Sequence, residues 1–163
     1  MANAKGRAMA TLGLWRPKHD VNVQQIGRLA ACYGVSAVIV HARKRIKPGG
    51  IDTTRATRTI PFIMSEDLIA SCPVEAVPIA VEITDSAVDI TGFVHPDSAY
   101  YIFGPEDGTL PKSVMASCAS TIKIPTSYCL NMAMAVNVVL YDRVAKQRAT
   151  NQSWSDFFDG ETK

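Results

Sequence analysis

One arginine, two amides and one carboxylate in this sequence could take part in chemistry. Asn22 and Arg28 have five residues between them, Glu106 follows a Gly-Pro pair, and Asn131 precedes a long apolar segment. A guanidinium stays protonated, so Arg28 could hold a phosphate through two parallel hydrogen bonds and stabilise a developing negative charge. Asn131 could help Arg28 to position a nucleophilic oxygen, and Asn22 could orient Arg28; positioning of that kind lowers reaction barriers strongly.

Each of these residues also has a purely structural interpretation. Arg28 could be a surface arginine on a helix, and Asn22 or Asp20 could cap the start of that helix. Asn131 is a good helix N-cap, a role that is compatible with a catalytic one. These alternatives remain open at this point.

Several other kinds of chemistry are disfavoured by the sequence. It contains neither the Gly-x-Gly-x-x-Gly pattern of dinucleotide-binding oxidoreductases nor a Walker phosphate loop. Its four cysteines show no Cys-x-x-Cys spacing and its histidines number three, so no metal site is predicted. Cys129 has no basic partner nearby in the sequence that would activate it as a nucleophile.

Apolar runs separated by helical patterns predict an α/β fold. The expected helices include one after Asp20 that ends before Gly34, a short one over Glu66–Ser71, and a last one over Met132–Gln147. Strands are expected over Ala10–Trp15, Val35–Val40, Ile60–Met64, Val77–Ile83, Ala99–Phe103 and Ser120–Ile124. We therefore predict a mostly parallel sheet of five or six strands with helices on both faces, and a ligand site at the carboxyl ends of the strands.

The first half of the last helix is apolar almost all round. A chain of 163 residues has little core with which to surround a helix, so the pattern predicts a homodimer through the Met132–Leu140 face.

Three short motifs together resemble the SpoU–TrmH family of knotted, S-adenosylmethionine-dependent RNA ribose methyltransferases. The first is Asn22 with Arg28, the second is Phe-Gly-Pro-Glu ending at Glu106 with a later Leu-Pro, and the third is Ile-Pro followed by Cys-Leu-Asn ending at Asn131. They stand in the family's order and span most of the chain. Two positions depart from the family pattern: Thr109 replaces a glycine, and Cys129 replaces a serine.

The resemblance implies a C-terminal trefoil knot, S-adenosyl-L-methionine as cofactor, and transfer to a ribose 2′-hydroxyl of RNA. The implied catalytic residues are Asn22, Arg28, Glu106 and Asn131. The implied cofactor-binding residues are Val81, Glu82, Gly104, Glu106, Gly108, Ile124, Cys129 and Leu130. Transfer RNA is the favoured substrate, because small relatives without a separate RNA-binding domain often modify it. Ribosomal RNA, or a non-catalytic RNA-binding module that kept the fold, are the alternatives.

A basic segment over His41–Thr59 carries six cations against a single acid, Asp52. A charge run is often only a solvated loop. Beside a methyltransferase site it becomes the expected RNA-contacting surface, because attraction to phosphates supplies most non-specific affinity. The RNA-binding candidates are Arg43, Lys44, Arg45, Lys47, Arg55 and Arg58.

Composition sets the remaining expectations. Apolar residues make up 47% of the chain and the net charge is +2, which suits a single globular domain over residues 1–163. No leader and no apolar run long enough to cross a membrane is evident, and the cysteines suit a reducing compartment, so we expect a cytoplasmic protein.

Overall fold

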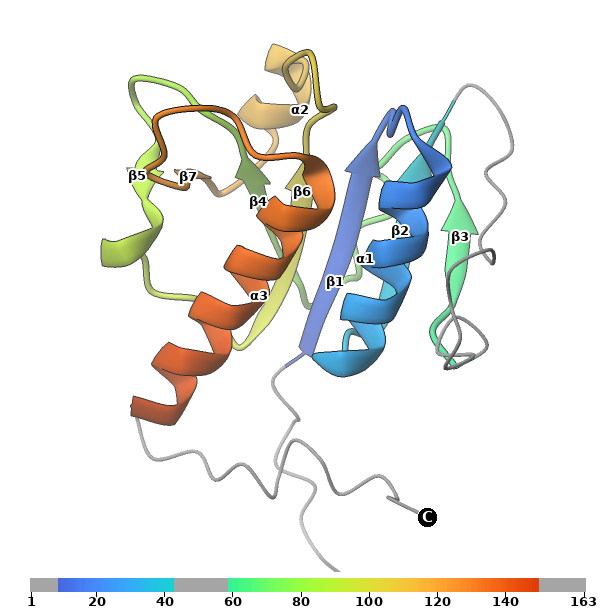
Figure 1. The fold of residues 1–163 in the computed structure, drawn as a ribbon, viewed down its shortest axis with the longest axis horizontal. Helices are drawn as coiled ribbons and strands as arrows, with labels where there is room; N and C mark the ends of the chain where they lie inside the picture. The colour runs from blue at the N-terminus through green and yellow to red at the C-terminus, as the bar shows by residue number, and fades with distance from the viewer. Residues whose placement is uncertain (1–8, 43–58, 150–163) are drawn as a thin grey trace, which may run out of the picture.

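The computed structural model describes residues 9–42 and 59–149 and shows an α/β fold (Figure 1). Seven parallel strands form one sheet in the order β3-β2-β1-β6-β4-β7-β5. The strands are β1 (Met9–Trp15), β2 (Ala37–His41), β3 (Phe62–Met64), β4 (Val77–Val81), β5 (Val88–Asp89), β6 (Ser98–Phe103) and β7 (Ser120–Lys123). The helices are α1 (Asp20–Cys32), α2 (Lys112–Ala116), α3 (Met132–Ala149) and the short 3-10 helix η2 (Ile90–Gly92).

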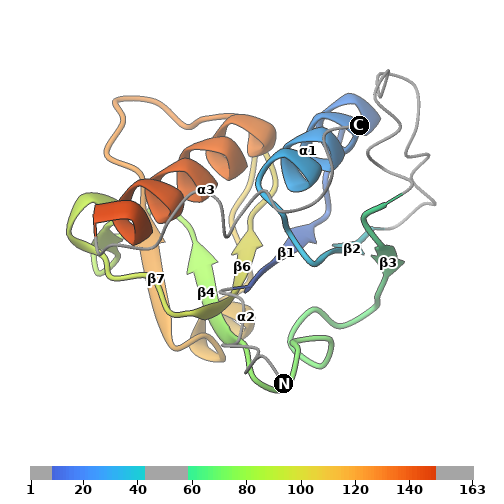
Figure 2. The same cartoon turned by 90° about the horizontal axis from the view of Figure 1, so that it is seen from below.

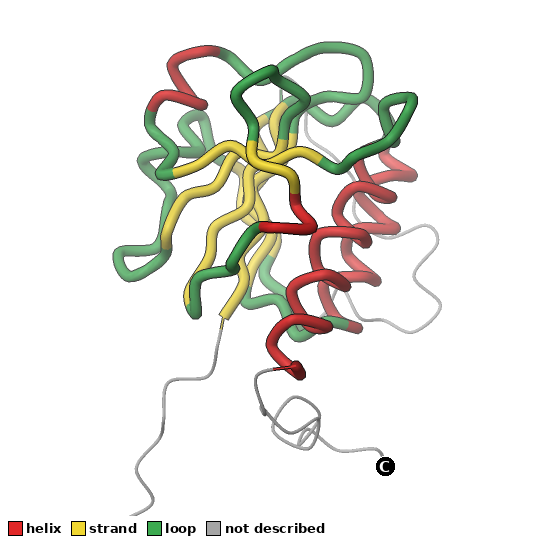
Figure 3. Tube along the Cα trace, turned by 90° about the vertical axis from the view of Figure 1, so that its left-hand side faces the viewer, coloured by secondary structure: helices red, strands yellow, loops and turns green. Residues whose placement is uncertain are grey.

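The two long helices cover one face of the sheet and α2 lies on the other, as Figure 2 shows. Seen from the side, α1 and α3 lie next to each other along the sheet (Figure 3). Because every strand is parallel to its neighbours, their carboxyl ends meet at one edge, and the loops of that edge come together there.

Central strand β6 shows why the sheet needs cover on both faces. Tyr101 and Phe103 pack with the α1–α3 core cluster, whereas Tyr100 and Ile102 belong to a second cluster beneath α2. All four side chains are buried. A strand buried on both faces has no polar alternation, which is why its sequence reads as a continuous apolar run.

The predicted parallel α/β sheet is confirmed, with differences in detail. The sheet has seven strands rather than five or six, because the two-residue β5 is too short to leave an apolar pattern. The helix expected over Glu66–Ser71 is wrong: this segment forms turns. Asp67 Oδ1 accepts from the amides of Ile69 and Ala70, and such local bonds compete with helix formation. The trefoil knot stays a prediction.

Helix α3 is not surrounded in the way that its apolar sequence suggested. Val136, Val139 and Leu140 are buried within the chain itself, but Met134 is 49% exposed and Tyr141 64% exposed. Any second subunit would therefore contact the outward side of α3 rather than the whole Met132–Leu140 face. Within the two described ranges, no helix is long and apolar enough to cross a membrane.

Candidate active site

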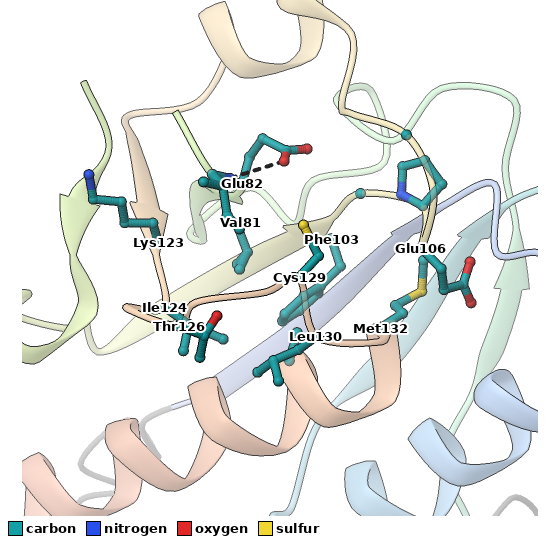
Figure 4. A pocket seen from close by; sticks show the side chains of 15 residues that line it. Val81, Glu82, Phe103, Glu106, Lys123, Ile124, Thr126, Cys129, Leu130 and Met132 are labelled. Carbon is teal, nitrogen blue, oxygen red and sulfur yellow. Dashed lines mark hydrogen bonds between the residues drawn. The ribbon is translucent and has the colours of Figure 1, made fainter. Parts of the chain in front are cut away.

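An open pocket lies at the carboxyl ends of β4, β6 and β7, closed from below by the loop that leads into α3 (Figure 4). It encloses about 580 Å³ of empty space, part of it continuous with solvent. All eight residues predicted to bind the cofactor line it: Val81, Glu82, Gly104, Glu106, Gly108, Ile124, Cys129 and Leu130. The structure thus gathers these residues in one place, while their role stays a prediction.

Glu82 joins two of the strand ends that form the pocket. Its carboxylate accepts hydrogen bonds from the Leu110 amide at 2.8 Å and from the Ile83 amide at 3.0 Å. A Cβ on Gly104 would lie only 2.8 Å from Glu82 Oε2, so a side chain there would push this carboxylate away from the Leu110 amide. Glu82 therefore fixes the loop after β6 to the end of β4, a structural role that the sequence did not reveal.

Asn22 and Glu106 meet although they come from different motifs. Asn22 Nδ2 donates to Glu106 Oε1 over 2.5 Å, and the Lys18 amide donates to Glu106 Oε2 over 3.2 Å. Figure 4 shows the Glu106 carboxylate pointing away from Cys129 and Leu130. The proposed capping role of Asn22 is wrong: α1 begins at Asp20, and the Asn22 side chain reaches the pocket loop instead.

Asn131 directly precedes α3 and caps the start of this helix, as predicted. Its Oδ1 accepts from the Met134 amide at 2.9 Å, and its own carbonyl accepts from the Ala135 amide. The residues on either side of it, Leu130 and Met132, line the pocket. The side chain of Asn131 is exposed, so it stands at the rim of the pocket with one amide atom already engaged.

Arg28 lies apart from the pocket. It is exposed on α1 and lines a separate groove between α1 and α3, together with Leu29, Ala133 and Met134. The structure therefore brings Asn22 to Glu106 but does not place Arg28 beside them within one chain. The six basic residues predicted to contact RNA, Arg43 to Arg58, lie outside the described residues.

Sequence reasoning missed some of the pocket lining. Lys123, Thr126, Phe103 and Met132 also face the cavity (Figure 4). Lys123 ends β7 and its ammonium lies 3.5 Å from the Thr84 carbonyl. Lys123 stands at the carboxyl end of a parallel strand, where ligands bind, so this rule could have identified it.

Comparison with known proteins gives a consistent result. The model of the "SpoU rRNA Methylase family" matches residues 9–141, which is most of the chain. Among curated proteins, none matches the chain in sequence.

Three solved structures show the same fold. The A. aeolicus TrmH/SpoU tRNA modifying enzyme has a TM-score of 0.79 at 13% identity, with 94% of this chain and 85% of that chain covered. A second structure, described as "Structural insights into the 2-OH methylation of C/U34 on tRNA", has a TM-score of 0.73 at 23% identity. The match covers 88% of this chain and 99% of that chain. The AdoMet-bound rRNA methyltransferase from Sinorhizobium meliloti has a TM-score of 0.72 at 23% identity, covering 91% and 59%. The chain spans only 58% to 62% of the length of this and other solved rRNA and SpoU methyltransferases.

Proposed function

Because the chain belongs to the SpoU rRNA methylase family, we propose that it transfers a methyl group from S-adenosyl-L-methionine to a ribose 2′-hydroxyl of RNA. One observation carries the proposal: residues from two distant motifs, Asn22 and Glu106, hydrogen bond at the mouth of a pocket lined by all the expected cofactor residues. A non-catalytic RNA-binding module would have no need to keep this arrangement.

The pocket suits S-adenosylmethionine chemically. Val81, Ile124 and Leu130 offer apolar surface for an adenine ring, and the open backbone at Gly104 offers polar atoms at close approach. Glu82 and Glu106 are both among the lining residues, and the negative charge of Glu82 favours the positive charge of a sulfonium. When bound, the cofactor supplies an electrophilic methyl group. The solved relative that holds AdoMet supports the assignment.

The chain's own residues would position the acceptor. Arg28 would hold the target phosphate and stabilise the charge that develops on the 2′-oxygen. Asn22 would fix Glu106, and Asn131 would orient the ribose from the rim of the pocket. Arg28 lies in the α1–α3 groove, and in the homodimer that we propose it would act at the pocket of the partner subunit.

Transfer RNA is the proposed substrate. The solved structure described under 2-OH methylation of C/U34 on tRNA is matched over 99% of its length, and this likeness supports transfer RNA. The basic residues between Arg43 and Arg58 would attract its phosphates. Ribosomal RNA is the alternative, and the cytoplasm is the compartment where we place the reaction.

The acceptor atom can be tested directly. The methylated position in transfer RNA would be found from the mass of a nuclease-resistant dinucleotide, and the assay repeated with a single 2′-deoxy nucleotide there. We expect unchanged binding and no methyl transfer. Methylation of the deoxy substrate would place the methyl group on a base and overturn the proposed reaction.

A further inference from the structure

An aromatic pair stands where β1 and β2 end, on the opposite side of β1 from the pocket strands. Trp15 and His41 are register partners in the sheet, and their rings stack with centroids 4.1 Å apart and planes 10° apart. The Arg16 guanidinium carbon lies 5.3 Å from the centroid of the Trp15 ring. Both rings are half-buried and Arg16 is exposed, so the cluster presents aromatic and cationic surface to solvent.

The backbone that places Arg16 is unfavourable. Among the described residues other than glycine, Arg16 alone has a positive φ, at 49°. It also precedes Pro17, and a residue before proline is normally extended. Such a conformation costs about 1–3 kcal/mol and persists only where neighbouring contacts impose it. Here the Arg16 amide donates to the His41 carbonyl at 2.7 Å, which ties the strained residue to the end of β2.

A purely structural role explains only part of this cluster. Trp15 packs against the core cluster beneath α2, and that accounts for its buried side. It does not account for a strained arginine held at the exposed side of the same ring. Strained residues gather at functional sites, and an aromatic ring next to a guanidinium is a common surface for nucleic-acid bases.

The cluster is also connected to the candidate active site. Lys18, two residues after Arg16, donates its amide to Glu106, and its ammonium forms an ion pair with Asp107. Arg16 is therefore close in sequence to Lys18, which contacts the predicted catalytic residue Glu106. The predicted RNA-binding residues Arg43 to Arg45 follow His41 almost directly in the sequence.

We propose that Trp15, His41 and Arg16 bind an unpaired RNA base that flanks the methylated nucleotide. The base stacks on the Trp15–His41 pair, and the Arg16 guanidinium contacts the base plane or its phosphate. This inference rests on the proposed function, because it takes RNA as the substrate. It adds a base-binding site on β1 and β2 to the predicted phosphate contacts of the basic segment.

The fluorescence of Trp15 provides a direct test. The sequence contains one other tryptophan, Trp154, so a Trp154→Phe protein reports on Trp15 alone. Oligoadenylate should quench this fluorescence saturably, whereas heparin, an anion without bases, should bind without comparable quenching. Equal quenching by both would mean that charge alone is sensed, and would overturn the stacking site.

Matched variants test the affinity. Trp15→Leu should weaken oligoadenylate binding at least about fivefold, and Trp15→Phe should retain most of it. Arg16→Gln should weaken binding about two- to fivefold, more than Lys112→Gln, which removes an exposed charge from α2. If circular dichroism shows that Trp15→Leu does not fold, Arg16→Gln and the fluorescence titration still test the proposed base-binding site. Wild-type affinity in Arg16→Gln together with unquenched Trp15 would refute the site.

Failure of this inference differs from failure of the proposed function. Methyl transfer to RNA that persists with unchanged affinity in Trp15→Leu would remove the stacking site and leave the reaction standing. Saturable quenching by oligoadenylate in a protein that transfers no methyl group would leave the stacking site standing and remove the reaction.

Discussion

Asn22 of α1 donates its amide to the carboxylate of Glu106, with Nδ2 and Oε1 2.5 Å apart across 84 residues of sequence. Asn22 is 7% exposed, so this hydrogen bond is shielded from solvent on one side. A neutral amide is well suited to it, because it donates to the carboxylate without adding a charge that would have to be desolvated. The contact fixes α1 against the pocket loop.

Exchanging the amide and the carboxylate between positions 22 and 106 tests this contact. Asn22→Asp should lower the free energy of unfolding by about 1–3 kcal/mol or more, because it opposes two carboxylates and removes the donor. Adding Glu106→Gln should recover much of the loss, since the introduced glutamine can donate to the new carboxylate and still accept from the Lys18 amide. Urea denaturation of the two single variants and the double variant gives the coupling energy. Asp107→Asn is the control, and additive effects would contradict the contact.

Arg28→Ala should reduce kcat at least tenfold while affinity for S-adenosylhomocysteine stays nearly unchanged. The reason is that Arg28 lies in the α1–α3 groove, away from the cofactor pocket, and is proposed to act on the phosphate and the developing alkoxide. Calorimetry and single-turnover methyl transfer separate the two quantities. Gln25→Ala, an exposed change on the same helix, is the control. Retention of more than about a tenth of kcat, a loss below roughly 1.4 kcal/mol, would remove Arg28 from the catalytic group.

Met134→Glu should convert a dimer into monomers. Met134 is 49% exposed on the outward side of α3 and borders the Arg28 groove, so a buried carboxylate there would be costly in a dimer but harmless in a monomer. Sedimentation of wild type and variant at micromolar concentration measures the change. Val74→Glu, at a fully exposed residue far along the chain, is the matched control. A wild-type species of the 17.7 kDa chain mass would contradict the homodimer itself.

The sequence predicted the parallel sheet well because buried parallel strands leave a strong signal. The runs that form β1, β2, β4 and β6 are largely apolar on both faces, whereas in β7 only Ile122 is buried. The prediction of secondary structure failed where short-range hydrogen bonds from side chains determine the local structure. Asp67 and Ser65 both favour a helix start by type, yet their hydrogen bonds close turns over residues 65–71 instead.

The candidate site, too, could be predicted only in part from the sequence. The rule that ligands bind at the carboxyl ends of parallel strands predicted where the pocket lies, and the family resemblance supplied the individual lining residues. The sequence could not show that the Asn22 side chain leaves its helix for Glu106, because that contact depends on the pairing of β1, which precedes α1, with β6, which precedes Glu106. Nor could it show that Arg28 faces α3 rather than the pocket, since a one-residue shift along a helix turns a side chain by about 100°.

Tyr100→Phe should stabilise the protein. The Tyr100 side chain is fully buried, and among the described residues none hydrogen bonds to its hydroxyl. An unsatisfied buried hydroxyl costs about 1–3 kcal/mol, so its removal should raise the free energy of unfolding. Tyr33→Phe is the opposite control: the Tyr33 hydroxyl donates to Asn137 Oδ1 at 3.0 Å, and its loss should destabilise. If Tyr100→Phe instead destabilises the protein as Tyr33→Phe does, the hydroxyl of Tyr100 has a partner.

A buried polar network joins α3 to the amino-terminal end of β6, opposite the pocket. Arg143 Nη1 donates to the Tyr101 hydroxyl at 3.2 Å, and that hydroxyl lies 2.6 Å from His95 Nδ1. The Tyr101 hydroxyl can therefore donate to an unprotonated Nδ1, which leaves the proton on His95 Nε2, 2.8 Å from Asp142. Burial lowers the pKa of His95 below its usual value; Asp142 opposes this shift, and the charges of Arg143 and Lys146 reinforce it.

The stability of the protein should consequently fall as the pH drops through the range in which an unfolded histidine titrates. The unfolded state binds a proton near pH 6.5, while the folded state keeps His95 neutral until a lower pH. The stabilisation is thus complete above that range and is lost below it, with a slope of at most about 1.4 kcal/mol per pH unit. Urea denaturation between pH 5.5 and 7.5 measures the slope, and His95→Gln should flatten it. An equally steep slope in His95→Gln would show that another group takes up the proton.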